Sequence, residues 1–343
     1  MTRTVFFHIG SVKTGTTGLH KFCYENRDAL LEQDVNYVQF QPPQLHLPRW
    51  ANADYLMNQD FDPGVVVEAI NASPQSKILI SDEALMGRPQ IWQHPVFRDM
   101  RRVVILYLRN SVELVASWAS ENSLPYNFRQ VEHSTGRGVV SVDEGIGFCS
   151  MKYRGLLLQF LNAVQSDSDL GVVIRPFPPQ LPDETLVENF FKILEVSETG
   201  IRDLVAMSGK DGANANVGSS RKYCDAAYLL SRLAYQYDIP HLYTKELVDT
   251  VYAQLQSGDS RKVIDTLSMP EKTFILNHLA TTTSTLIEEL QAPPMINEMP
   301  TVNRAAGNLY SSISSGEITQ LFLEYFVRRL ASRAKTKVPV PGR

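Results

Sequence analysis

The chain has 343 residues, of which 43% are hydrophobic and 20% charged, and its formal net charge is −4. This composition is that of an ordinary globular protein and excludes a disordered or fibrous chain. The small negative charge excludes a general attraction to nucleic acid or to an anionic membrane. Any anion must therefore be bound by a local site.

Compartment and membrane contact can be read from the cysteines and the apolar runs. Cys23, Cys149 and Cys224 are widely spaced and odd in number, which argues against a disulfide scaffold and is typical of a reducing cytoplasm. No apolar stretch approaches the roughly 18–20 residues of a membrane span. The apolar run near the N-terminus is too short for a signal peptide. We expect a cytoplasmic protein without a membrane span.

In chain order, the first 180 residues alternate apolar runs with amphipathic segments, as βαβ units on a parallel sheet do. Apolar runs predict strands at 4–9, 35–40, 77–80, 103–108 and 171–174, and a helix is expected at 16–33. Beyond residue 185 the apolar spacing is helical, at 186–194, 220–237, 245–255, 270–290 and 317–334. We expect an α/β core at 1–185, a helical C-terminal portion at 186–335 and a frayed tail at 336–343.

The turn after the first expected strand, residues 10–17, reads Gly-Ser-Val-Lys-Thr-Gly-Thr-Thr. Backbone N–H groups and the positive end of a helix dipole form an anion site at such a turn. The glycine spacing matches a P-loop, but Thr16 stands where the ATP-binding loop has lysine, and the lysine is Lys13. This arrangement suits a shorter anion and no metal. The alternative is a plain βα turn in which a threonine caps the helix.

Residues 8–17 resemble the 5′-phosphosulfate loop of sulfotransferases that use 3′-phosphoadenosine 5′-phosphosulfate (PAPS), with Val12 in place of the usual proline. The resemblance implies a three-layer, P-loop-like fold with a central parallel sheet and helices on both faces. It implies PAPS as cosubstrate and 3′,5′-ADP as product, with Lys13 at the bridging oxygen. The loop residues expected to bind PAPS are Ser11, Lys13, Thr14, Gly15, Thr16 and Thr17.

A second motif follows the strand expected at 103–108. Arg109 ends this strand, and Ser117 follows eight residues later in the next helix. Both positions match the family's 3′-phosphate motif, with Ser111 in place of proline. Arginine offers a planar fork of donors that suits a phosphate. The alternative is that Arg109 pairs with a nearby carboxylate such as Glu113.

The base that removes the acceptor's proton is expected where the strand at 77–80 ends, because ligands of open α/β sheets lie outside the carboxyl ends of strands. The resemblance agrees: some family members carry a catalytic histidine there, and others use glutamate. Glu83 is the first choice and Asp82 the second, and the alternative is that this acidic cluster caps a helix. His46, after the second expected strand, is the rival.

The sequence leaves the acceptor and the oligomeric state open. A hydroxyl of a small molecule, a glycan or a lipid is expected as acceptor, and no metal-ligand spacing occurs. Ser219, Arg221 and Lys222 are further candidates for the 3′-phosphate, or simply residues of a surface loop. The alternative functions are a P-loop kinase for a small metabolite and a non-catalytic nucleotide-binding protein.

Overall fold

The computed structural model describes residues 3–40, 50–58, 60–122, 141–177, 185–207, 220–236, 244–255, 261–292, 294–300, 319–322 and 325. The chain forms two compact units that interleave along the sequence. The first consists of Met1–Leu114, Met151–Val217 and Leu276–Met299. The second consists of Val115–Ser150, Gly218–Ile275 and Pro300–Arg343. The division expected at residue 185 stays a prediction.

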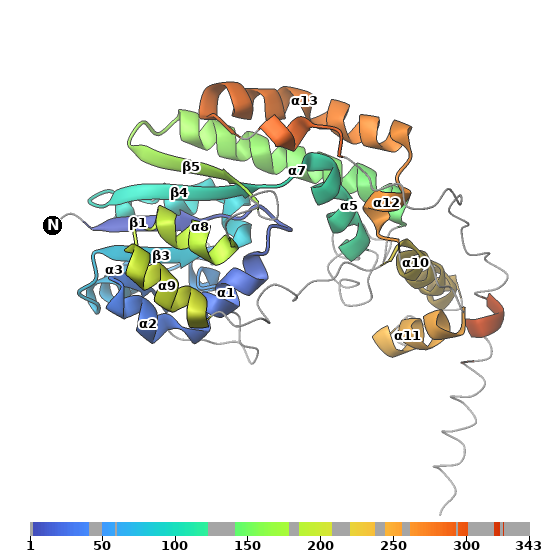
Figure 1. The fold of residues 1–343 in the computed structure, drawn as a ribbon, viewed down its shortest axis with the longest axis horizontal. Helices are drawn as coiled ribbons and strands as arrows, with labels where there is room; N and C mark the ends of the chain where they lie inside the picture. Colours follow the sequence, from blue (N-terminus) through green and yellow to red (C-terminus); the bar gives the residue numbers. More distant parts are fainter. Residues whose placement is uncertain are drawn as a thin grey trace, which may run out of the picture. The chain divides into compact units, whose positions relative to one another are not determined.

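A five-stranded sheet forms the centre of the first unit (Figure 1). Its strands are β1 (Thr4–His8), β2 (Val35–Tyr37), β3 (Lys77–Ser81), β4 (Arg101–Leu108) and β5 (Leu170–Pro176). They lie in the order β2-β3-β1-β4-β5 and every pair is parallel. All five strands were predicted from their apolar runs, because strands of a parallel sheet are buried on both faces. β1 is the middle strand, so the loop that follows it lies between the ends of β3 and β4.

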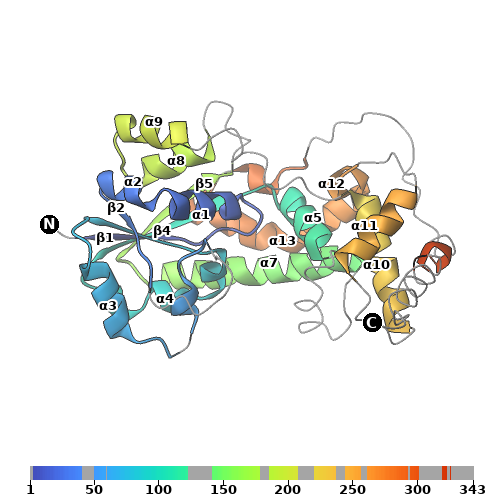
Figure 2. The same cartoon turned by 90° about the horizontal axis from the view of Figure 1, so that it is seen from below.

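Helices cover both faces of this sheet, which confirms the predicted α/β fold (Figure 2). One face carries α1 (Thr16–Glu25), α2 (Arg27–Glu32), α8 (Leu186–Ile193) and α9 (Glu198–Met207). On the other face lie α3 (Pro63–Asn71), α4 (Pro89–Trp92) and the C-terminal part of α7 (Val142–Gln165). Four 3₁₀ helices are described in the chain, namely η1 (Asp54–Met57), η2 (Glu83–Gly87), η3 (Pro95–Phe97) and η6 (Pro294–Asn297).

One hydrophobic core of the first unit lies between the sheet and the helices α1, α2, α8 and α9. Phe6, Tyr107 and Phe190 belong to it and are at most 2% exposed. The single helix expected at 16–33 is wrong, because the chain breaks at Asn26 into α1 and α2. The side-chain amide and the backbone N–H of Asn26 both donate to the Phe22 carbonyl, which ends α1 there.

The second unit is helical in its described residues. It contains α10 (Arg221–Gln236), α11 (Lys245–Gln254) and α12 (Val263–Thr266), besides parts of α5 (Ser111–Asn122), α7 and α13 (Met269–Leu290). α10 and α11 share a core with Leu230, Leu247 and Val251 fully buried. The helices predicted at 220–237, 245–255 and 270–290 are therefore confirmed.

Candidate functional site

The loop between β1 and α1 lies at the carboxyl edge of the sheet and continues the pairing with β4. The Ser11 N–H donates to the Tyr107 carbonyl at 2.9 Å, and the Tyr107 N–H donates to the Gly10 carbonyl at 2.7 Å. The first half of the loop is thus fixed by backbone bonds. Its second half leads directly into α1.

Three loop residues have a left-handed backbone: Gly10 has φ 102°, Lys13 φ 62° and Gly15 φ 73°. Glycine adopts this conformation without steric cost, whereas lysine does so at a cost. At Gly15 the space is also restricted, because a Cβ atom would lie 3.0 Å from Leu186 Cδ2 and 3.1 Å from Phe177 Cε2. Strained residues of this kind gather at functional sites.

The two helices that begin beside the loop differ at their N-termini. Gly15 precedes α1 and gives no side-chain hydrogen bond, and the first turn of α1 has no acidic residue. At α5, by contrast, the Asn110 side-chain oxygen accepts from the Val112 and Glu113 N–H groups at 3.1 and 3.3 Å. The first amides of α1 therefore suit an anion, while those of α5 are occupied.

Most hydroxyl groups of the loop bond within the protein. Thr14 donates to the Ser11 carbonyl at 2.5 Å, and Thr16 donates to Glu83 Oε2 at 2.7 Å. The Ser11 side chain is fully buried and donates to the Val12 carbonyl at 3.3 Å. Thr17 is exposed. An anion in the loop would thus meet backbone amides, Lys13 and Thr17 rather than the hydroxyls of Ser11 and Thr14.

Arg109 follows β4 and reaches the same loop. Its Nε donates to Glu113 Oε2 at 3.0 Å, so the ion pair weighed as the alternative is present. Its Nη1 lies 3.5 Å from the Lys13 carbonyl oxygen, and its guanidinium lies 5.9 Å from the centre of the Phe177 ring. Glu113 therefore holds Arg109 with its outer nitrogens at the loop. The structure brings Arg109 and Lys13 together.

The two acidic residues after β3 have different tasks. The Asp82 side chain accepts from the Ala84 N–H at 2.8 Å and caps η2, and Asp82 is 8% exposed. The capping alternative thus applies to Asp82. Glu83 is half-buried, bonds to Thr16 and packs against the backbone of Gly10. Of the two carboxylates, Glu83 is the one that faces the loop.

Two buried histidines, His8 and His20, lie next to the loop, their rings 5.9 Å apart. Burial lowers the pKa of His20 to about 4, and burial together with His20 lowers the pKa of His8 well below its usual value. His8 Nδ1 lies 2.7 Å from Ser81 Oγ. Both imidazoles are neutral at pH 7, and their burial (1% and 6% exposed) keeps them from an acceptor.

The remaining predicted residues belong to the second unit or lie outside the described residues. Ser117 is half-buried in α5, in the part of that helix that belongs to the second unit. Arg221 donates to Asp225 at 3.1 Å and to Asp143 at 2.8 Å, so two carboxylates occupy it. Lys222 is half-buried in α10. The predictions for His46 and Ser219 lie outside the described residues.

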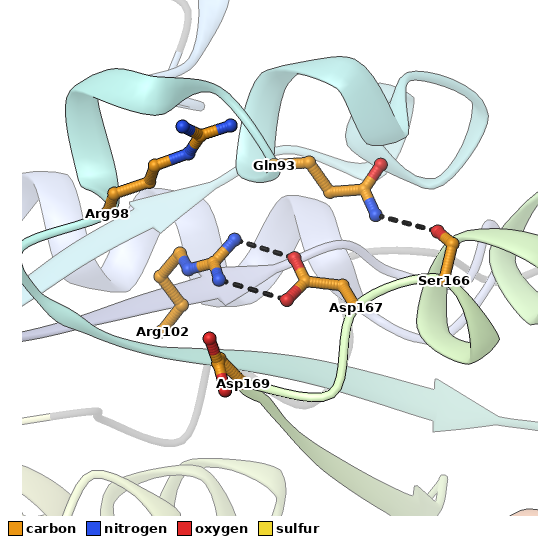
Figure 3. Close-up of a pocket in the computed structure, with 6 residues that line it drawn as sticks. All are labelled: Gln93, Arg98, Arg102, Ser166, Asp167 and Asp169. Carbon is orange, nitrogen blue, oxygen red and sulfur yellow. Dashed lines mark hydrogen bonds and ion pairs between the residues drawn. The ribbon is translucent and has the colours of Figure 1, made fainter.

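A polar pocket of about 520 Å³ is found at the opposite end of β4 (Figure 3). Arg102, near the start of the strand, pairs with both carboxylate oxygens of Asp167 at 2.7 and 3.0 Å. The side chains of this pair are 8% and 16% exposed. Arg98 and Asp169, also on the pocket wall, are exposed. The ion pair joins the start of β4 to the turn before β5, and the pocket is separate from the loop at Lys13.

Nowhere in the described part of the chain do three or more His, Cys, Asp or Glu side chains gather as metal ligands would. Within the same residues, no helix has both the length and the apolar character needed to cross a membrane.

Comparison with models of known protein families gives no match, and no curated protein sequence matches the chain. Among solved structures, the chain is similar to a sulfotransferase from Alicyclobacillus acidocaldarius. The two are 12% identical with a TM-score of 0.36, and the alignment covers 85% of this chain and 98% of the other. At this identity and TM-score the likeness carries no functional argument.

Proposed function

We propose that this protein is a sulfotransferase that moves a sulfuryl group from PAPS to a hydroxyl of a small molecule, a glycan or a lipid. The transfer is an in-line attack with a general base and without a metal. The observation that carries the proposal is the loop between β1 and α1. In it Lys13 and the uncapped start of α1 meet Arg109 on one side and Glu83 on the other.

The donors around the loop fit a nucleotide with a phosphate at both ends of its ribose. The first amides of α1 and the Lys13 ammonium are suited to the 5′-phosphosulfate. Arg109, held by Glu113, presents its outer nitrogens to the 3′-phosphate, with Ser117 proposed as a further donor. A triphosphate would lack the lysine that it requires at position 16, where this chain has threonine.

Bound PAPS supplies the sulfuryl group and leaves as 3′,5′-ADP. Lys13 stabilises the negative charge that develops on the bridging oxygen, so its contribution is larger in the transition state than in the ground state. Glu83 accepts the proton of the acceptor hydroxyl. The placement of Glu83 beside the loop supports this role, since the acceptor must approach the sulfuryl group there.

The proposal is tested without knowledge of the acceptor by measuring melting temperatures with nucleotides. A ligand at about 100 times its dissociation constant stabilises a protein by about 2.7 kcal/mol. We expect a shift of this size with 3′,5′-ADP, independent of Mg²⁺, and a smaller one with 5′-AMP. Arg109→Ala should remove most of the difference between the two nucleotides, whereas Arg27→Ala, an exposed arginine of α2, should not change it.

The opposite pattern would overturn the proposal. A Mg²⁺-dependent shift with ATP, and none with 3′,5′-ADP, would favour a kinase. Once 3′,5′-ADP binding is measured, ³⁵S-labelled PAPS and a library of hydroxyl compounds identify the acceptor class.

A further inference from the structure

Thr16 connects the anion loop to Glu83. It is the first residue of α1, is 3% exposed, and donates from Oγ1 to Glu83 Oε2 at 2.7 Å. Glu83 also lies next to the other end of the loop, since a Cβ atom on Gly10 would lie 3.3 Å from the Glu83 Cβ. The Glu83 side chain is therefore bonded to one end of the loop, and its Cβ lies beside the other.

The hydroxyl and the backbone N–H of Thr16 are available to different hydrogen-bond acceptors. A hydroxyl group has a single hydrogen to donate, and Glu83 receives it. A phosphate or phosphosulfate oxygen only accepts hydrogen bonds, so this hydroxyl cannot serve it while the bond to Glu83 persists. The backbone N–H of Thr16, in the first turn of α1, has no intrahelical acceptor and remains suited to an anion.

The same bond distinguishes the two oxygens of the Glu83 carboxylate. Oε2 accepts from Thr16, and no hydrogen bond to Oε1 is present within the described residues. Threonine is branched at Cβ, which restricts its side chain to two main rotamers in a helix, and the bond to Glu83 selects the direction of its donor. A base must lie within hydrogen-bonding reach of the proton that it removes. Holding one oxygen against the loop leaves the other free for that proton.

We propose that Thr16 is a positioning residue whose hydroxyl orients Glu83 for proton removal and does not bind the phosphosulfate. The inference rests on the proposed function and assigns two tasks to one residue: the backbone N–H serves the anion, and the hydroxyl serves the base. It differs from the expectation that the family resemblance gives, in which the whole residue counts as a ligand of PAPS.

The test separates binding from turnover with two substitutions. Thr16→Val keeps the shape and the backbone N–H but removes the hydroxyl, whereas Thr16→Ser keeps the hydroxyl. We expect Thr16→Val to bind 3′,5′-ADP within about threefold of the wild type, a change of less than about 0.7 kcal/mol, by calorimetry. Its turnover of PAPS should fall by about 10–10²-fold, the range for a displaced catalytic group. Thr16→Ser should recover most of that loss.

Two controls show whether the effect passes through Glu83. In a Glu83→Gln background, Thr16→Val should change turnover by less than about twofold, because residues acting as one unit are not additive. Thr283→Val makes the same change at another buried threonine, whose hydroxyl bonds the Leu279 carbonyl of its own helix at 3.0 Å. This control should alter neither nucleotide binding nor turnover.

The outcomes distinguish the inference from the proposed function. If Thr16→Val binds 3′,5′-ADP at least tenfold more weakly than the wild type, the hydroxyl is a ligand of the nucleotide and the inference is overturned alone. Undiminished turnover in Thr16→Val overturns it as well. If the wild type itself does not bind 3′,5′-ADP, the proposed function is wrong and the inference is lost with it.

Discussion

The geometry at Gly15 makes a prediction that depends on no assumption about function. Gly15→Ala places a Cβ on a residue with φ 73°, within 3.0 Å of Leu186 and 3.1 Å of Phe177. The left-handed conformation costs a non-glycine residue about 1–2 kcal/mol, and overpacking of this kind adds about 1–3 kcal/mol. We expect the free energy of unfolding to fall by about 2–5 kcal/mol.

A second glycine supplies the matched control. Gly155 lies inside α7, and a Cβ there would have no atom within 4 Å. Because glycine in a helix is less favourable than alanine by roughly 0.5–1 kcal/mol, Gly155→Ala should stabilise the protein by about that amount. The two substitutions add the same methyl group, and their effects should have opposite signs.

Urea unfolding followed by circular dichroism at 222 nm measures both variants, and melting temperatures give an independent value. At roughly 2–4 °C per kcal/mol for a domain of 150–250 residues, Gly15→Ala should lower the melting temperature by several degrees. If Gly15→Ala were as stable as the wild type, the tight left-handed turn at Gly15 would be refuted. A destabilising Gly155→Ala would refute the open space around Gly155 on α7.

Three further predictions concern the loop and its surroundings. Lys13→Ala should lower turnover by about 10²-fold or more, and Lys13→Gly should lower it equally. Lys13→Gly should also raise the free energy of unfolding by about 1 kcal/mol, because Lys13 has φ 62°, a conformation that glycine adopts without cost. Glu83→Gln should lower turnover by about 10²–10⁴-fold while 3′,5′-ADP binding stays nearly unchanged. His46→Ala should retain the turnover of the wild type, and the reverse result in initial-rate assays would make His46 the base. Acidification from pH 7.5 to 5.0 should destabilise the protein, and His20→Phe should reduce that loss, as urea titrations at the two pH values will show.

The sheet and the neighbourhood of the site could be predicted because both depend on short-range patterns. Continuous apolar runs located the five strands, and Lys13, Glu83 and Arg109 each lie in the segment that follows a strand. In a parallel sheet the carboxyl ends of neighbouring strands meet at one edge. Residues from three distant parts of the chain were therefore expected to lie together, and the described structure places them at this edge.

The direction of individual side chains could not be predicted, because it depends on backbone angles and on distant partners. Asp82 and Glu83 are adjacent, yet Asp82, with an extended backbone at φ −162°, turns inward to cap η2, while Glu83 faces the loop. Similarly, the Thr16 hydroxyl has its partner 67 positions further along the chain. No local pattern distinguishes such a hydroxyl from one that binds a ligand.

Helix α9 was missed for a related reason. The Thr199-Gly200 pair interrupts the apolar spacing near its start. The glycine lies against a distant segment, because a Cβ at Gly200 would lie 2.0 Å from the Gln33 side-chain oxygen. A contact between segments so far apart leaves no periodic signal in either one.

The acid dependence follows from the buried His20. Its pKa in the folded protein is about 4, against an ordinary value of 6.5, so the unfolded chain binds the extra proton between these pH values. The free energy of unfolding is therefore unaffected by this group well above pH 6.5 and decreases as the pH falls toward 4. At pH 5.0 the loss of stability from His20 alone is about 2 kcal/mol. His8, whose pKa is also lowered, acts in the same direction. Since exposed carboxylates titrate alike in both proteins, the difference between the wild type and His20→Phe isolates the histidine. Equal losses of stability in the two proteins between pH 7.5 and 5.0 would mean that His20 is accessible to protons in the native state.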